Sequence, residues 1–229
     1  MSRLAENLTS VKARIAHAAK DAGRDPHSIQ LIAVSKTKPV QDVELAIEAG
    51  QRDFAENYLQ DALAKIESIQ QPGIVWHFIG PVQSNKTRNI AENFHWVHTL
   101  DRDKIARRLN DQRPDKLPPL NVCLQINLDD ENSKSGVKLD QAIQLGYLVQ
   151  ALPNLHLRGL MFIPAPKSNS AARLQTCQRA RQLFIKFQHE FPKCDTLSLG
   201  MSADLEEAIA AGSTMVRIGT DIFGAREAK

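Results

Sequence analysis

The chain has 229 residues, of which 24% are charged and 42% hydrophobic, and its formal net charge at pH 7 is +3. This length allows one large domain or two small ones, and the small, scattered charge argues against a dedicated nucleic-acid-binding or membrane-surface protein. No apolar run is long enough to span a bilayer, and residues 1–7 contain no apolar signal core. The cysteines, Cys123, Cys177 and Cys194, form no metal or disulfide pattern, so we expect a reducing cytoplasmic location.

Helical and strand patterns alternate from the first residues to the last. Apolar residues at helical spacing, from Leu4 to Ile15, predict a first helix that ends near Gly23. Apolar runs then predict eight strands, which begin near residues 30, 53, 74, 94, 120, 155, 194 and 214. A helical pattern follows each of the first seven strands, and the segment 111–119 is predicted to be a loop because it holds three prolines.

The alternation indicates parallel strands joined by helical crossovers. Eight such units favour a closed (β/α)₈ barrel with an additional N-terminal helix, in a single domain over residues 1–229. An open doubly wound sheet is the alternative, because the strands predicted near residues 53 and 94 are short.

The most informative stretch is Leu31–Lys36, four apolar residues and a serine that lead into a lysine. A short apolar run of this kind is typical of a central parallel strand. A lysine at its carboxyl end is costly to desolvate unless it has a partner or a task. Two interpretations remain open, a solvated lysine at a strand exit and a Schiff-base lysine whose burial eases deprotonation.

In a barrel, functional residues gather at the carboxyl ends of the strands. Besides Lys36, we expect Asn57, Asn127 and Ser202 there, with Gly219-Thr220 after the last strand. A hydroxyl residue at a helix start and a glycine with backbone N–H groups are parts of an anion-binding loop, and barrels often hold a phosphate between their last two loops. The alternative is simple capping, with Ser202 as an N-cap and Gly219 in a turn.

Two polar residues lie inside predicted strands. Arg217 points either into the barrel, where it needs an anion or an acceptor such as a ring nitrogen, or outward to a glutamate such as Glu206. His77 is either a satisfied core histidine or a group that stacks on a flat ring. His95 and His98 would point to opposite faces of one strand, so we predict no metal site.

The chain resembles the pyridoxal-phosphate homeostasis protein family, known in bacteria as the YggS family, nearly from end to end. The resemblance rests on several motifs in order: Ala33-Val34-Ser35-Lys36, Glu56-Asn57-Tyr58-Leu59-Gln60, His77-Phe78-Ile79-Gly80, Gln83-Ser84-Asn85-Lys86, Gln125-Ile126-Asn127, Lys134-Ser135-Gly136, Arg158-Gly159-Leu160-Met161, Leu199-Gly200-Met201-Ser202 and Val216-Arg217-Ile218-Gly219-Thr220.

This resemblance implies a barrel like the N-terminal domain of alanine racemase that binds pyridoxal 5′-phosphate. By the same match, Lys36 carries the cofactor as a Schiff base, and Ser202 with the Gly219-Thr220 backbone holds its phosphate. Arg217 would face the pyridine nitrogen, and Asn57 and His77 would line the ring.

Two residues depart from the family pattern. Ala55 stands where glycine is usual, and Asp221 stands where a small apolar residue is usual. Asp221 puts a negative charge beside the phosphate loop; we expect it to point to solvent.

The resemblance further implies a protein of cofactor homeostasis that holds and delivers pyridoxal phosphate. Racemisation needs a second acid/base opposite the lysine, and neither Tyr58 nor Tyr147 matches the tyrosine that a further domain supplies in racemases. An arginine at the ring nitrogen also makes the cofactor a poor electron sink. We therefore expect a monomeric carrier, with PLP-dependent apo-enzymes as partners, and not an enzyme. The alternatives are a low-activity amino-acid racemase or lyase, and a phosphate-binding barrel that leaves Lys36 unexplained.

Overall fold

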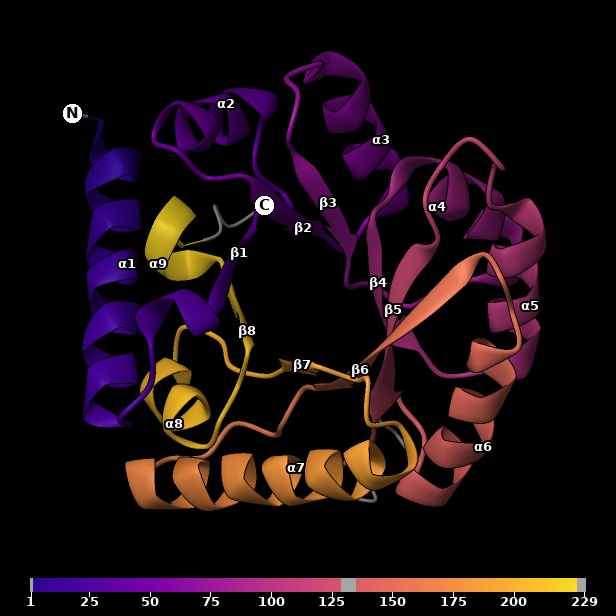
Figure 1. Cartoon of the computed structure of the whole chain (residues 1–229). Helices are drawn as coiled ribbons and strands as arrows, with labels where there is room; N and C mark the ends of the chain where they lie inside the picture. The colour runs from indigo at the N-terminus through magenta and orange to yellow at the C-terminus, as the bar shows by residue number, and fades with distance from the viewer. Residues whose placement is uncertain (1, 129–134, 226–229) are drawn as a thin grey trace.

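The computed structural model describes residues 2–128 and 135–225, which form a closed barrel of eight parallel strands in sequence order (Figure 1). The strands are β1 (Gln30–Val34), β2 (Asp53–Glu56), β3 (Val75–Phe78), β4 (Trp96–Leu100), β5 (Leu120–Ile126), β6 (Leu155–Phe162), β7 (Thr196–Ser198) and β8 (Met215–Ile218). β8 pairs in parallel with β1, which closes the barrel. The predicted (β/α)₈ barrel is confirmed, and the open-sheet alternative is wrong.

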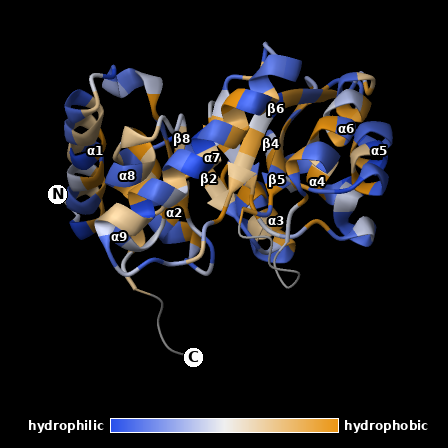
Figure 2. Cartoon of the chain, turned by 90° about the horizontal axis from the view of Figure 1, so that it is seen from below, coloured by the Kyte–Doolittle hydropathy of each residue, from blue (hydrophilic) through white to orange (hydrophobic). Residues whose placement is uncertain are grey.

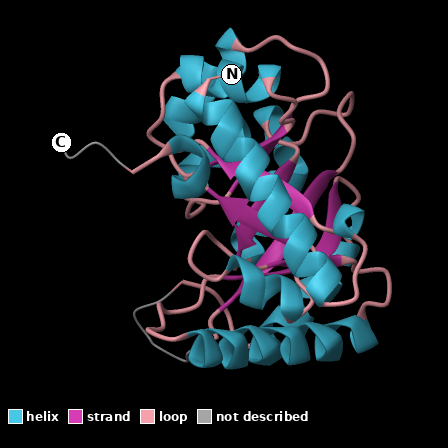
Figure 3. Cartoon of the chain, turned by 90° about the vertical axis from the view of Figure 1, so that its left-hand side faces the viewer, coloured by secondary structure: helices cyan, strands magenta, loops and turns pink. Residues whose placement is uncertain are grey.

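Helices surround the barrel on its outer side (Figures 1 and 3). They are α1 (Arg3–Asp21), α2 (Val40–Glu48), α3 (Leu59–Ser68), α4 (Thr87–Asn93), α5 (Asp103–Gln112), α6 (Leu139–Gln150), α7 (Ser170–Glu190), α8 (Leu205–Ala210) and α9 (Thr220–Phe223), with the short 3₁₀ helices η1 (Pro26–Ser28) and η2 (Ser84–Lys86). The additional N-terminal helix, α1, packs against α2, α8 and α9. No helix in the described ranges is long and apolar enough to cross a membrane.

The strands are buried on both faces, because successive side chains point alternately to the helices and to the barrel interior. The larger apolar layer lies between strands and helices, and the helices turn hydrophilic residues outward (Figure 2). A smaller apolar cluster fills the interior: Ile32, Val34, Ala55, Trp96, Cys123, Met161 and Met215. Ala55 is thus a core residue, paired with Val34 of β1 and His77 of β3.

Two predicted strand starts lie too early in the chain. Phe94 still donates its backbone N–H to Ile90 at the end of α4, so β4 begins only at Trp96. Cys194 closes a turn onto Phe191 after α7, so β7 begins at Thr196. In both places an apolar residue that ends a helix resembles, in sequence, the first residue of a strand.

Candidate functional site

A cavity of about 330 Å³ opens at the carboxyl ends of the strands, the end that the barrel fold predicts. Residues from β1, β6 and β8 and from the loops after several strands line it: Val34, Lys36, Asn57, Ile79, Met161, Ile163, Met201, Ser202, Ala203, Arg217, Gly219 and Thr220. The structure thus brings six of the seven residues that the sequence marks for cofactor binding to one cavity. The exception is His77.

Lys36 is placed by a sharp turn at the end of β1. Ser35 is fully buried and its N–H donates to the carbonyl of Ala55 in β2. Thr37 then adopts a left-handed backbone (φ 65°), which is uncommon for a β-branched residue. The N–H of Lys38 closes the turn by donating to the carbonyl of Ser35 at 3.0 Å. The half-buried Lys36 side chain is therefore presented to the cavity from a rigid strand end.

The loops after β7 and β8 form the opposite wall. Ser202 does not cap α8, because that position belongs to Asp204. Asp204 instead shapes the loop by accepting the Met201 N–H at 2.7 Å. Gly219 passes so close to β1 that an added Cβ would lie 3.2 Å from the Val34 carbonyl oxygen. In the first turn of α9, the N–H groups of Thr220 and Asp221 have no acceptor within the helix, whereas those of Ile222 and Phe223 donate to the Gly219 carbonyl.

Arg217 points into the barrel. Its guanidinium donates to Ser198 Oγ at 2.6 Å and to the carbonyl of Phe162 at 2.8 Å. Burial lowers the pKa of Arg217 to about 10, so the group remains a cation near neutral pH. The alternative in which Arg217 pairs with Glu206 is wrong, because Glu206 bonds to Arg14.

Arg14 of α1 also pairs with Asp221. Glu206, which follows the β7 loop, and Asp221, which follows Gly219-Thr220, therefore share the single positive charge of Arg14. Asp221 is partly exposed and turned toward α1, so its charge does not enter the cavity.

Asn57 supplies an unused acceptor to the cavity wall. Its Oδ1 atom is buried and has no hydrogen-bond partner among the described residues. A buried acceptor without a partner costs about 1–3 kcal/mol. A ligand donor that reaches Asn57 would remove this cost.

Comparisons with known proteins identify the family of the chain. The family described as "Alanine racemase, N-terminal domain" matches residues 3–227. The pyridoxal phosphate homeostasis protein of Escherichia coli K12 is 54% identical over 230 residues, covering 99% of this chain and 98% of the relative. The protein of the same name from Pseudomonas aeruginosa is 55% identical over 227 residues, covering 99% and 97%. The chain belongs to the pyridoxal phosphate homeostasis protein family.

Solved structures extend the comparison. PipY of Synechococcus elongatus, a structure with PLP bound, is 33% identical, with a TM-score of 0.84, and the match covers 97% of this chain and 100% of PipY. An alanine racemase from Clostridium difficile is 14% identical with a TM-score of 0.78, and the match covers 98% of this chain and 57% of the racemase. The racemase likeness shows the shared fold alone.

For this member of the pyridoxal phosphate homeostasis family, His77 does not line the cavity. The residue is fully buried in β3, with its ring stacked on Trp96 at 5.6 Å between centroids. Its nitrogens face His98 and Asp53 at 3.0 and 3.1 Å. Of the two interpretations of His77, the structure favours the satisfied core histidine.

In residues 2–128 and 135–225, no cluster of His, Cys, Asp and Glu could hold a metal ion.

The sequence did not single out the ion pair behind Lys36. Lys65 of α3 is 3% exposed, and its Nζ donates to Glu56 Oε1 at 2.6 Å and to the Ser35 carbonyl at 2.7 Å. Burial raises the pKa of Glu56, although Lys65 and Ser35 counteract the shift. The available signal was the spacing of Leu59, Ala62 and Lys65, which puts a lysine on the buried stripe of the helix.

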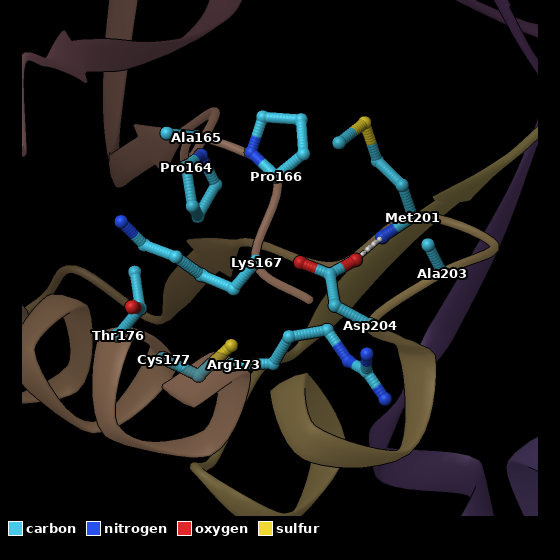
Figure 4. Close-up of a pocket in the computed structure, with 10 residues that line it drawn as sticks. All are labelled: Pro164, Ala165, Pro166, Lys167, Arg173, Thr176, Cys177, Met201, Ala203 and Asp204. Atoms are coloured by element: carbon cyan, nitrogen blue, oxygen red, sulfur yellow. Dashed lines mark hydrogen bonds between the residues drawn. The ribbon is translucent and has the colours of Figure 1, made fainter. Parts of the chain in front are cut away.

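Two smaller spaces adjoin the main cavity. One of about 100 Å³ shares Met201 and Ala203 with it and reaches toward α7 (Figure 4). Arg173 in its wall bonds to Glu207, and the carboxylate of Asp204 bonds to Met201, so these two charged groups are already engaged. Asn127, expected at the site, lies instead in a separate cavity of about 300 Å³. Lys134 of the family motif lies outside the described residues.

Proposed function

We propose that this protein binds pyridoxal 5′-phosphate covalently through Lys36 and takes part in the cell's homeostasis of that cofactor. The observation that carries the proposal is the meeting of an amine, an anion-binding loop and a buried arginine in one cavity. A pyridoxal phosphate molecule needs these three groups, for its aldehyde, its phosphate and its ring nitrogen. The PLP-bound PipY structure and the names of the relatives support the same conclusion.

Each residue in the cavity would bind the part of pyridoxal phosphate that suits its chemistry. Ser202, Gly219 and Thr220 would bind the phosphate through hydroxyl and backbone N–H groups. Arg217 would donate to the ring nitrogen, and Asn57 would accept a donor from the ligand. The bound cofactor supplies electrophilic chemistry toward amines. An arginine donor keeps the ring nitrogen largely unprotonated, which limits its use as an electron sink.

We propose a carrier and not an efficient amino-acid racemase. Lys36 and Arg217 are the ionisable residues in the lining of the cavity, and only a lysine amine readily exchanges a proton near neutral pH. Tyr58 lines a different cavity and Tyr147 is exposed on α6. Among the described residues, nothing in the lining provides proton delivery from the face opposite Lys36. The proposed recipients are PLP-dependent apo-enzymes, and the proposed state is a monomer in the cytoplasm, where the three buried free thiols stay reduced.

Borohydride reduction of the PLP-loaded protein, followed by peptide mapping, tests the binding proposal. We expect the adduct on Lys36 and its loss in Lys36→Ala, with Lys186→Ala on the outer face of α7 as a matched control. An adduct on Lys38 or Lys86 would reject the assignment.

Solvent-deuterium exchange with inversion, over a panel of L- and D-amino acids, tests the carrier proposal. Slow exchange on one face is compatible with it. Inversion at about 1 s⁻¹ or faster that disappears in Lys36→Ala would replace the carrier by a racemase.

A further inference from the structure

A line of hydrogen-bonded side chains crosses the barrel interior beneath the cavity and ends on Arg217. Asp53 Oδ1 lies 3.1 Å from His77 Nε2, and His77 Nδ1 lies 3.0 Å from His98 Nε2. His98 Nδ1 lies 2.9 Å from Ser198 Oγ, which accepts from Arg217 at 2.6 Å. These residues come from five different strands, and we call them the Asp53–Arg217 chain.

The Asp53 carboxylate fixes which atom donates and which accepts in every hydrogen bond of the Asp53–Arg217 chain. Asp53 Oδ1 also accepts from Gln30 Nε2 at 2.6 Å, as a carboxylate does. His77 must then carry its hydrogen on Nε2, which leaves Nδ1 to accept from His98 Nε2. His98 Nδ1 can in turn only accept, so the Ser198 hydroxyl donates to it and offers its oxygen lone pairs to Arg217.

Burial makes this order strict. His77, His98 and Ser198 have no exposed surface, so their polar atoms can pair only within the protein. Burial also lowers the pKa of His77, although Asp53 opposes the shift, and it lowers the pKa of His98 well below the usual value. Both rings are therefore neutral near pH 7, and a neutral ring has one donor and one acceptor nitrogen.

We propose that Asp53, His77, His98 and Ser198 are positioning residues, which hold the Arg217 guanidinium in one orientation toward the group bound in the cavity. Because the Ser198 hydroxyl hydrogen points to His98, the Asp53–Arg217 chain leaves the oxygen lone pairs of Ser198 directed at Arg217. Ser198 Oγ and the Phe162 carbonyl then hold two N–H groups of the Arg217 guanidinium. The remaining donors of the guanidinium then point in fixed directions. The inference rests on the proposed function only for the identity of the bound group, pyridoxal phosphate.

Histidine-ring NMR of the ¹⁵N-labelled protein without added cofactor tests the chain itself. We expect His77 and His98 to be neutral at pH 7.5, each with its hydrogen on Nε2. A hydrogen on Nδ1 of either ring, alone or in addition, would overturn the proposed direction. This measurement does not depend on pyridoxal phosphate. It therefore tests the hydrogen-bond order of the Asp53–Arg217 chain separately from the proposed function.

Paired variants of His98 test the effect on Arg217. His98→Phe fills similar space but breaks the chain, whereas the amide of His98→Gln can accept from Ser198 and donate to His77. We expect His98→Phe to weaken pyridoxal phosphate binding roughly two- to ten-fold, the effect of one net hydrogen bond, and to shift the visible cofactor band. His98→Gln should restore both readouts.

The control is Leu124→Ala, which removes a fully buried β5 side chain from the layer between strands and helices, outside the Asp53–Arg217 chain. It should lower the melting temperature and leave cofactor affinity and spectrum unchanged. Equal losses in His98→Phe and His98→Gln, or unchanged binding in His98→Phe, would overturn the proposal. If His98→Phe does not fold, Ser198→Ala takes its place with the same expected losses, and unchanged binding and spectrum in that variant would overturn it.

Discussion

Lys65 Nζ lies 2.7 Å from the backbone carbonyl oxygen of Ser35, the residue directly before Lys36. The same ammonium is 2.6 Å from Glu56, whose Oε1 also accepts from the Ser35 hydroxyl at 2.6 Å. A helix outside the barrel thus fixes the strand end that presents Lys36. Burying the Lys65 ammonium and the Glu56 carboxylate carries a desolvation penalty, which their mutual attraction offsets. Removing either partner leaves the other charge buried and unpaired and therefore destabilises the fold.

Lys65→Met should lower the free energy of unfolding at pH 7 by about 3–5 kcal/mol. The variant leaves the Glu56 carboxylate buried without its cation, and the residue must take up a proton or remain unpaired. Urea unfolding measures the loss, and the exposed Lys186→Met on α7 is the matched control. The double variant Lys65→Met, Glu56→Gln should recover most of the loss. A loss below about 1 kcal/mol would show that the pair does not hold β1 and α3 together.

The fold was predictable because its signals are local and repeated. Apolar runs such as Leu31–Val34 and helical stripes such as that of α1 each bury a face, and their alternation leaves few topologies. Strand starts near Phe94 and Cys194 were misplaced because an apolar residue that closes a helix and one that opens a strand look alike in sequence.

The candidate site was predictable only in part. Residues that follow a strand end, such as Lys36 and Ser202, gather at one rim of any such barrel. His77 lies within β3 and not after its end, so its side chain is buried in the barrel interior below the cavity. Sequence alone does not tell how deep in a barrel a side chain lies. Lys65 and Arg14 act from helices, and their partners lie 9 or more and 188 or more residues away in the chain, respectively.

Ser202→Ala should weaken the binding of pyridoxal phosphate by about 1.5–3 kcal/mol, the cost of one hydrogen bond to a charged group. Ser202 lines the cavity, and its hydroxyl has no partner among the described residues that the mutation would disturb. Equilibrium dialysis measures the affinity, and the melting temperature without cofactor should not change. Ser68→Ala, an exposed serine on α3, is the control. Unchanged affinity would remove Ser202 from the phosphate site.

Arg14→Gln should weaken pyridoxal phosphate binding by roughly two- to five-fold, the range of a solvent-accessible ion pair. The mutation releases Asp221 beside the proposed phosphate loop, where a free carboxylate repels an anion. Adding Asp221→Asn should restore the affinity, although the contact between α1 and α8 stays broken. If the double variant binds as weakly as the single one, Arg14 acts through its other contacts, to Glu206 and to the Ser202 carbonyl, and not by neutralising Asp221.

The free energy of unfolding should fall as the pH drops below about 6.5, because His98 is buried in its neutral form. Burial lowers the pKa of His98 well below the ordinary value, with His77 and Arg217 adding to the shift. In this pH range the unfolded chain binds a proton at His98 that the folded chain does not, so acid favours unfolding. Between pH 7.5 and pH 5.5 this residue should account for a loss of about 1.4 kcal/mol. Urea unfolding at both pH values measures it, and His98→Gln should reduce the loss by that amount, whereas the exposed His189→Gln on α7 should leave it unchanged. An equal loss in wild type and His98→Gln would mean that His98 is already protonated in the folded protein, which would also contradict the proton order of the Asp53–Arg217 chain.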